Sequence, residues 1–252
     1  LAMGEDGVRF VADGGFTYAL RPGGEPQVTG MLFSDGFPGY TRGVAAAGPG
    51  EYIVTTANGQ VARWRPAQRE SEFLAEGCDQ LYGVAIAAGG AVVVAEKGTG
   101  RVLSIRSRQL EQLAGGLNQP AGVAAWGDTC LIAEEGAGKV VKLARGGVET
   151  LVDGLQRPQG ILVRGDLLYI VDAGARELIE YDLASGARRA IATELPVGAP
   201  PGVIPKPLGA IGQLSGPMGP FAGIAAGPDG TLYVSADAEG SVLALRPKRN
   251  IT

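Results

Sequence analysis

Two sets of polar residues recur at fixed positions around a repeated glycine, and they include the side chains best suited to chemistry. The first set comes directly before the glycine and contains Arg42, Tyr82 and Gln159. An arginine at such a position can clamp a carboxylate or a phosphate through paired hydrogen bonds, and a tyrosine can stack on a ligand or donate to it. These three residues form the predicted ligand-binding set, and pairing of Arg42 with a nearby carboxylate is the alternative.

The second set is acidic and lies further along each copy of the repeat: Asp13, Glu96, Glu134, Asp172 and, shifted by one place, Asp237. Ca²⁺ prefers oxygen ligands, so Glu96, Glu134, Asp172 and Asp237 would be the ligands of a metal. An acid at a strand end also accepts N–H bonds from a turn. We expect this structural role, with no metal and no other cofactor, and keep Ca²⁺ as the alternative. The adjacent Glu134-Glu135 exceeds what one turn needs, and we expect that pair to be solvated.

Histidine is absent from all 252 residues. This excludes Ser–His–Asp chemistry, histidine general bases and histidine-ligated zinc. The net charge of −4 gives no basic footprint, so nucleic acid is not the predicted partner. No apolar run reaches the roughly 20 residues that span a membrane. We expect a soluble chain; no signal peptide is visible in this sequence, and we assign it to no compartment.

The only cysteines are Cys78, in a predicted loop, and Cys130, in a predicted strand. A single disulfide would have to join positions 52 residues apart. Two free thiols are therefore the prediction, with one disulfide as the alternative.

Internal repetition indicates the architecture. The motif glycines follow one another at intervals of 40, 39, 38 and 63 residues, the last being one period plus an insertion, and they are Gly43, Gly83, Gly122, Gly160 and Gly223. Each unit has an inner strand that is apolar on both faces, a second apolar strand, a third strand that alternates with period two, and a weaker fourth strand. Such units predict a β-propeller, because one blade buries both of its faces only by stacking in a ring.

The predicted fold is all-β: a six-bladed β-propeller of four-stranded antiparallel blades, forming a single domain over 1–252. The opening segment 1–13 aligns with 224–236, which gives six units at about 1–39, 40–79, 80–118, 119–156, 157–215 and 216–252. The last blade lacks its outer strand. We expect upstream sequence or another chain to supply that strand, and hence the chain to be part of a longer protein. A solenoid of β-sheets is the alternative fold, but its repeats are usually shorter.

Two further features concern one face of the predicted ring. Because neighbouring strands are antiparallel, the inner strands begin and the second strands end on the same face around the central channel, which we call the channel-mouth face. The segment 196–220 interrupts the repeat, is rich in proline and contains one charge, Lys206. We expect it to fold over a blade edge; a lid or partner-binding loop is the alternative.

The repeated pattern Pro-x-Gly-(Ile/Val)-Ala … Leu-Tyr-Val-x-(Asp) … (Arg/Lys)-Val-x-x-(Ile/Leu) is clearest at 117–145, 155–183 and 219–247. It resembles NHL repeats. It is also similar to the wider six-bladed group that holds gluconolactonase-like, strictosidine-synthase-like and streptogramin-lyase-like proteins. The resemblance covers nearly the whole chain and implies the propeller fold, which hosts enzymes and binding scaffolds alike.

The residues that enzymatic members of this group use do not occur at the matching places. Gluconolactonase-like members hold a divalent metal with a Glu in a Glu-Gly-Pro start, an Asn and an Asp, and this chain has no Glu-Gly-Pro. Streptogramin-lyase-like members depend on histidine. We therefore predict an NHL-like binding or scaffold module that engages a small-molecule ligand or a protein partner on the channel-mouth face. The alternative is a gluconolactonase-like or strictosidine-synthase-like hydrolase or lyase with its site at the central channel.

Overall fold

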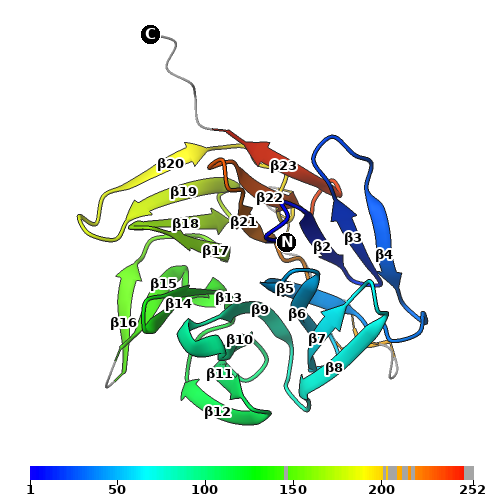
Figure 1. Cartoon of the computed structure of the whole chain (residues 1–252). Helices are drawn as coiled ribbons and strands as arrows, with labels where there is room; N and C mark the ends of the chain where they lie inside the picture. Colours follow the sequence, from blue (N-terminus) through cyan, green and yellow to red (C-terminus); the bar gives the residue numbers. More distant parts are fainter. Residues whose placement is uncertain (145–146, 201–202, 204–208, 212–214, 217–218, 247–252) are drawn as a thin grey trace.

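The computed structural model describes the chain except for residues 145–146, 201–202, 204–208, 212–214, 217–218 and 247–252. Figure 1 shows the strands arranged in sheets around a central axis, as the repeat predicts. The fold is a six-bladed β-propeller, and the predicted fold class is confirmed.

Five blades are four-stranded antiparallel sheets whose strands follow chain order. The first two blades contain β1 (Ala2–Met3), β2 (Arg9–Asp13), β3 (Phe16–Leu20), β4 (Gln27–Met31), β5 (Thr41–Gly48), β6 (Glu51–Thr56), β7 (Val61–Arg65) and β8 (Glu70–Ala75). The third and fourth contain β9 (Leu81–Ile86), β10 (Val92–Glu96), β11 (Arg101–Arg106), β12 (Gln109–Ala114), β13 (Pro120–Trp126), β14 (Thr129–Glu134), β15 (Lys139–Ala144) and β16 (Gly147–Val152). The fifth contains β17 (Pro158–Arg164), β18 (Leu167–Asp172), β19 (Glu177–Asp182) and β20 (Arg188–Ala192).

The sixth blade has three strands within the described residues: β21 (Ile224–Ala226), β22 (Leu232–Ala236) and β23 (Ser241–Leu245). This agrees with the predicted absence of an outer strand. Completion of the blade by upstream sequence or by another chain stays a prediction. Two short 3₁₀ turns, η1 (Ala88–Gly90) and η2 (Glu135–Ala137), are the helical elements of the described chain. Neither is long enough to cross a bilayer.

The motif glycines let the inner strands converge on the axis. A Cβ atom added to Gly122 would lie 2.0 Å from the carbonyl oxygen of Gln159, and one added to Gly160 would lie 2.4 Å from that of Ala222. Each glycine therefore faces the backbone that precedes the next motif glycine, where a larger residue does not fit. The residual space between the inner strands measures only ≈ 50 Å³.

Buried apolar clusters join neighbouring blades. Separate clusters connect blades one and two, two and three, three and four, four and five, and five and six. Among the described residues no such cluster joins blade six to blade one. That junction instead contains a cavity of ≈ 440 Å³ lined by residues such as Val11, Tyr18 and Val242. It also contains a cation–π contact in which Arg9 lies 5.0 Å from the ring centre of Tyr233.

Third-strand aromatics pack between neighbouring blades. Trp64 is 1% exposed, while Tyr181 is partly buried against the cluster of blades four and five.

Both cysteines are free. Cys130 is buried in its strand and Cys78 is half-buried, with no disulfide between them. The prediction of two free thiols is confirmed. Burial raises the pKa of the Cys78 thiol to about 11, so this thiol is protonated at neutral pH.

Candidate functional site

Four acids of the second set, Glu96, Glu134, Asp172 and Asp237, are called the ring carboxylates here, and each accepts a hydrogen bond from a backbone N–H group. Glu96 accepts a hydrogen bond from the backbone N–H of Asp79 (2.8 Å), and Glu134 accepts one from Asn118 (2.9 Å). These donors belong to the loop that leads into the inner strand of the same blade. Each acid therefore ties the end of the second strand to the start of the first.

The same role recurs in blades five and six. Asp172 accepts bonds from the N–H groups of Gln156 and Arg157, both at 2.8 Å, and from the turn that follows it. Asp237 accepts one from Gly198 at 2.9 Å. Burial raises the pKa of Asp237, and the Gly198 hydrogen bond opposes that rise only in part. Although the residue as a whole is exposed, the Gly198 backbone covers one oxygen of its carboxylate.

With these contacts, the carboxylates of Glu96, Glu134, Asp172 and Asp237 are not arranged to bind one shared divalent metal ion. A metal site needs several carboxylates to converge on one point. Within the described part of the chain, no group of three His, Cys, Asp or Glu side chains is close enough to hold an ion. The four ring acids instead point into four different loops.

Glu135 lies next to Glu134 but has a different environment. The backbone N–H of Glu135 donates to Gln119, and the residue opens the short turn η2. Its side chain is only 4% exposed and accepts from Lys97 (2.7 Å) and Arg157 (2.6 Å). The expectation that Glu134 and Glu135 form a solvated pair is wrong: both are buried, and each carboxylate has its own partners.

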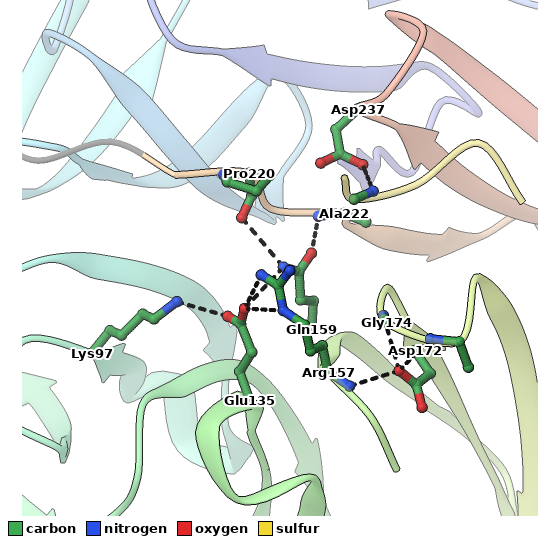
Figure 2. Close-up of polar contacts among 11 residues, drawn as sticks. Lys97, Glu135, Arg157, Gln159, Asp172, Gly174, Pro220, Ala222 and Asp237 are labelled. Carbon is green, nitrogen blue, oxygen red and sulfur yellow. Dashed lines mark hydrogen bonds and ion pairs between the residues drawn. The ribbon is translucent and has the colours of Figure 1, made fainter. Parts of the chain in front are cut away.

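Three blades supply this ion cluster, as Figure 2 shows. Lys97 directly follows β10 of blade three, Glu135 directly follows β14 of blade four, and Arg157 directly precedes β17 of blade five. A buried charge is tolerated when it is paired and fully hydrogen-bonded. Glu135, the buried charge of the cluster Lys97–Glu135–Arg157, meets that condition because each of its oxygens accepts from a cation, and the cluster fixes the relative positions of three loops.

Gln159, one of the predicted ligand-binding residues, is fully buried beneath this cluster. Its amide nitrogen lies 3.5 Å from Glu135 and 3.4 Å from the carbonyl oxygen of Pro220, and its amide oxygen accepts from the N–H of Ala222 at 2.8 Å. Its polar atoms are thus used within the protein (Figure 2). The structure places Gln159 as a support for the loop that enters blade six.

Arg42 and Tyr82, the other two predicted residues, contact each other. The guanidinium carbon of Arg42 lies 4.5 Å from the centre of the Tyr82 ring, and the ammonium of Lys97 lies 4.9 Å from it. Burial lowers the pKa of Arg42, while the charge and hydrogen bond of Tyr82 oppose that shift. Phe221 packs edge-on against the same ring at 5.7 Å. Tyr82 therefore joins the predicted set to the ion cluster.

The end of the insertion lies on the channel-mouth face. The N–H of Gly216 donates to the carbonyl of Ala57 in blade two, and a Cβ on Gly219 would lie 3.0 Å from the Tyr82 hydroxyl. Together with Pro220 and Phe221, these residues cross the start of the central channel. The expectation that the segment folds over a blade edge is wrong for these described residues. The part of the insertion at 201–202, 204–208, 212–214 and 217–218, which includes Lys206, lies outside the described residues.

A cleft of ≈ 610 Å³ opens between these loops, which we call the channel-mouth cleft. Its lining consists of Gln80, Tyr82, Lys97, Gly98, Gln119, Glu135, Gly136, Gln156, Arg157, Gly219 and Pro220. Of the three residues predicted to bind ligand, only Tyr82 belongs to the lining. The sequence did not single out Lys97 or Arg157. A signal for Lys97 exists, because Lys97 and Glu135 occupy equivalent repeat positions with opposite charges, where blades two and five have Ala57 and Ala173.

Comparisons with known proteins agree with the fold. The chain is similar to a virginiamycin B lyase from Staphylococcus aureus, in a catalytically inactive histidine-to-alanine form with quinupristin, at 13% identity and a TM-score of 0.65, covering 95% of this chain and 77% of that one. A candidate gluconolactonase aligns at 14% identity and a TM-score of 0.63, covering 92% and 83%. A chain of a nidogen/laminin complex aligns at 18% identity and a TM-score of 0.67, covering 77% and 78%. Neither a protein-family model nor a curated protein sequence matches the chain.

Proposed function

We propose that this protein is a β-propeller binding module that takes up a ligand, or a segment of a protein partner, in the channel-mouth cleft. One observation carries the proposal: the cleft has a preformed polar wall in which Lys97, Glu135 and Arg157 come from three successive blades. A rigid constellation of this kind lowers the ordering cost of binding.

The dimensions and position of the cleft support this function. Pockets that bind small molecules usually measure about 300–1,000 Å³ and place a few polar groups among apolar walls. The channel-mouth cleft lies within that range and combines Lys97 and Arg157 with the Tyr82 ring and Pro220. In propellers, loops on a rigid ring carry the variable residues that contact partners.

The similar structures are compatible with a binding role and with an enzymatic one. They include proteins described as a lyase and as a candidate gluconolactonase, and also a chain in a protein–protein complex. One fold hosts unrelated functions, so the choice depends on the residues of the site.

The second candidate function is a gluconolactonase-like or strictosidine-synthase-like hydrolase or lyase with its site at the central channel. Enzymes among the similar structures favour it. The residues favour it less. The lyase in that comparison is inactivated by loss of a histidine, and this chain has none. The ring carboxylates, which a metal-dependent mechanism would use, are engaged with separate loops.

A cleft-filling variant tests the proposal. Gln156→Trp places a large ring on an exposed lining residue outside the ion cluster, and Gln68→Trp makes the same change at an exposed position away from the cleft. A small-molecule library is screened by thermal shift against the wild-type protein and both variants. We expect at least one compound to stabilise the wild type and Gln68→Trp but not Gln156→Trp.

Two outcomes would contradict the binding proposal. Compounds that stabilise all three proteins equally would place the binding site elsewhere. Hydrolysis of a lactone by the wild-type protein, lost with EDTA and restored with Ca²⁺, would favour the enzymatic alternative.

A further inference from the structure

We infer that the channel-mouth cleft selects a small organic carboxylate with a polar body. This inference rests on the proposed function, because it names the chemistry of the ligand for the same cleft. It follows from which charged groups of the ion cluster remain accessible after their internal pairing.

Accessibility differs sharply between the anion and the cations of the cluster. The Glu135 side chain is 4% exposed, whereas those of Lys97 and Arg157 are 16% and 30% exposed. Glu135 is therefore less accessible than the two cations, and its carboxylate lies between them and next to Gln159 (Figure 2). A ligand that enters the cleft meets positive charge before it meets negative charge.

Hydrogen-bonding capacity leads to the same conclusion. Both carboxylate oxygens of Glu135 are already occupied, one by Lys97 and the other by Arg157. Lys97 has three donors and uses one on Glu135, while Arg157 has five donors and directs only its Nε and one terminal nitrogen to Glu135. The spare capacity of the cluster consists of donors, which suit an acceptor-rich anionic group.

The charges of the lining sum to one positive unit. Lys97 and Arg157 contribute two positive charges, and Glu135 contributes one negative charge. Arg42 lies behind the Tyr82 ring and outside the lining, so its charge is not part of this sum. The acids Asp79, beside Gly98, and Asp237, bound to Gly198, lie outside the lining. A singly charged carboxylate neutralises this excess.

The rest of the lining indicates a polar ligand body. Gln80, Gln119 and Gln156 come from the loops before three inner strands, and their amides supply both donors and acceptors. A phosphate group is a poorer match, because it carries more charge than the lining compensates and the described cleft has no long helix whose N-terminus would bind it.

The test is an NMR titration of ¹⁵N-labelled protein at constant ionic strength. The probes are N-acetylglycine, which combines a carboxylate with an amide, its uncharged amide analogue, inorganic phosphate, and a tetramethylammonium salt as the cation. Binding is followed at the backbone signals of the lining glycines Gly98 and Gly136. We expect these signals to shift with N-acetylglycine, less with phosphate, and not with the other two probes.

Two variants give opposite expected effects. Glu135→Gln keeps the side-chain shape and raises the net charge of the lining by one unit, so N-acetylglycine should bind about tenfold more tightly. Arg157→Ala removes an exposed donor and should weaken binding about tenfold or more. Unchanged spectra away from the cleft show that each variant is folded.

The outcomes separate the ligand class from the function. Weaker binding in Glu135→Gln, or selective shifts with the cation or with the uncharged amide, would overturn the carboxylate assignment and leave a binding cleft. Stronger shifts with phosphate than with N-acetylglycine would also overturn it. Shifts confined to residues outside the lining, unaffected by either variant, would contradict the binding site and the assignment together.

Discussion

Glu135 is a carboxylate from one blade held by cations from its two neighbours, so its removal should affect more than the cleft. Without it, Lys97 and Arg157 would face each other at the cleft wall without a counter-charge. Loss of one partner from a buried ion pair costs about 3–5 kcal/mol, and the partial exposure of both cations reduces this to about 2 kcal/mol. We expect that loss for Glu135→Ala, measured by urea unfolding.

The control and the coupling can be measured in the same series. Glu149→Ala changes an exposed glutamate of β16 and should cost less than about 0.5 kcal/mol. In a double-mutant cycle, Lys97→Ala should cost less in the Glu135→Ala background than in the wild type. Additive effects of the two substitutions would show that the ion pair makes no contribution to stability.

Glu96 is the ring acid whose titration should be visible in stability. Burial alone would raise its pKa, but hydrogen bonds from Arg101, Thr99 and the N–H of Asp79 hold the pKa below its usual value of 4.5. A depressed pKa stabilises the fold above the unfolded-state value, and this stability is lost as the pH falls through the folded-state value. We therefore expect the free energy of unfolding to drop below about pH 4.5, and to drop less in Glu96→Gln.

A second acid makes this comparison specific. Glu111→Gln removes an exposed carboxylate of β12, and its acid unfolding should follow that of the wild type. At pH 7, Glu96→Gln should be less stable than Glu111→Gln by about 1–3 kcal/mol, because charged hydrogen bonds are lost. Equal acid sensitivity in Glu96→Gln and the wild type would show that Glu96 does not control this transition.

The repeat pattern predicted the ring acids correctly as strand-end residues, but of the cleft lining it singled out only Tyr82. The position directly before the motif glycine holds Gln159, whose amide oxygen accepts a hydrogen bond from Ala222. It also holds Arg42, which packs behind Tyr82. The lining cations instead come from the positions just after a ring acid and three places before a motif glycine. Their side-chain directions depend on the loops, and a one-dimensional pattern does not contain that information.

At the scale of the strand, the motif glycine is the element that the sequence located best. Its spacing identified five of the six inner strands, because the steric demand at the axis recurs from blade to blade. The Gly122→Ala substitution would place a methyl group 2.0 Å from the carbonyl oxygen of Gln159. Since that neighbour is backbone, we expect a loss of about 3 kcal/mol or more in the free energy of unfolding.

The same substitution at another glycine provides the control. Gly24 has its nearest neighbour, the Cβ of Arg21, at 3.6 Å, which is an ordinary contact distance, so Gly24→Ala should change stability by less than about 1 kcal/mol. Similar unfolding midpoints for the two variants would mean that the inner strands can separate to admit a side chain.

The insertion shows where element-level prediction ends. Its length, proline content and apolar residues indicated that it packs on something, but they did not indicate which surface. Contacts with Ala57 and Tyr82 bring its end across blades two and three, far from it in sequence. Tertiary contacts of this kind have no local signature in a segment without regular secondary structure.

At the scale of the whole molecule, the ring is not equally well closed at all its junctions. Buried apolar clusters join blades one through six in order, while the described junction between blades six and one has a cavity of ≈ 440 Å³. Strand β23 is also the outermost described strand of its sheet, and its residues are exposed or half-buried. Regions with few buried apolar contacts open at a lower free-energy cost than the core.

We therefore expect the propeller to open first between blades six and one. In native-state hydrogen exchange, the amides of β22 and β23 should exchange at least about tenfold faster than those of β18, which is buried between two apolar clusters. A strand supplied by upstream sequence or by another chain would slow exchange in β23 selectively, since it would pair with that edge. Uniform protection in β18 and β23 of the 252-residue chain would contradict the weak junction, because an open edge next to a cavity does not protect its amides.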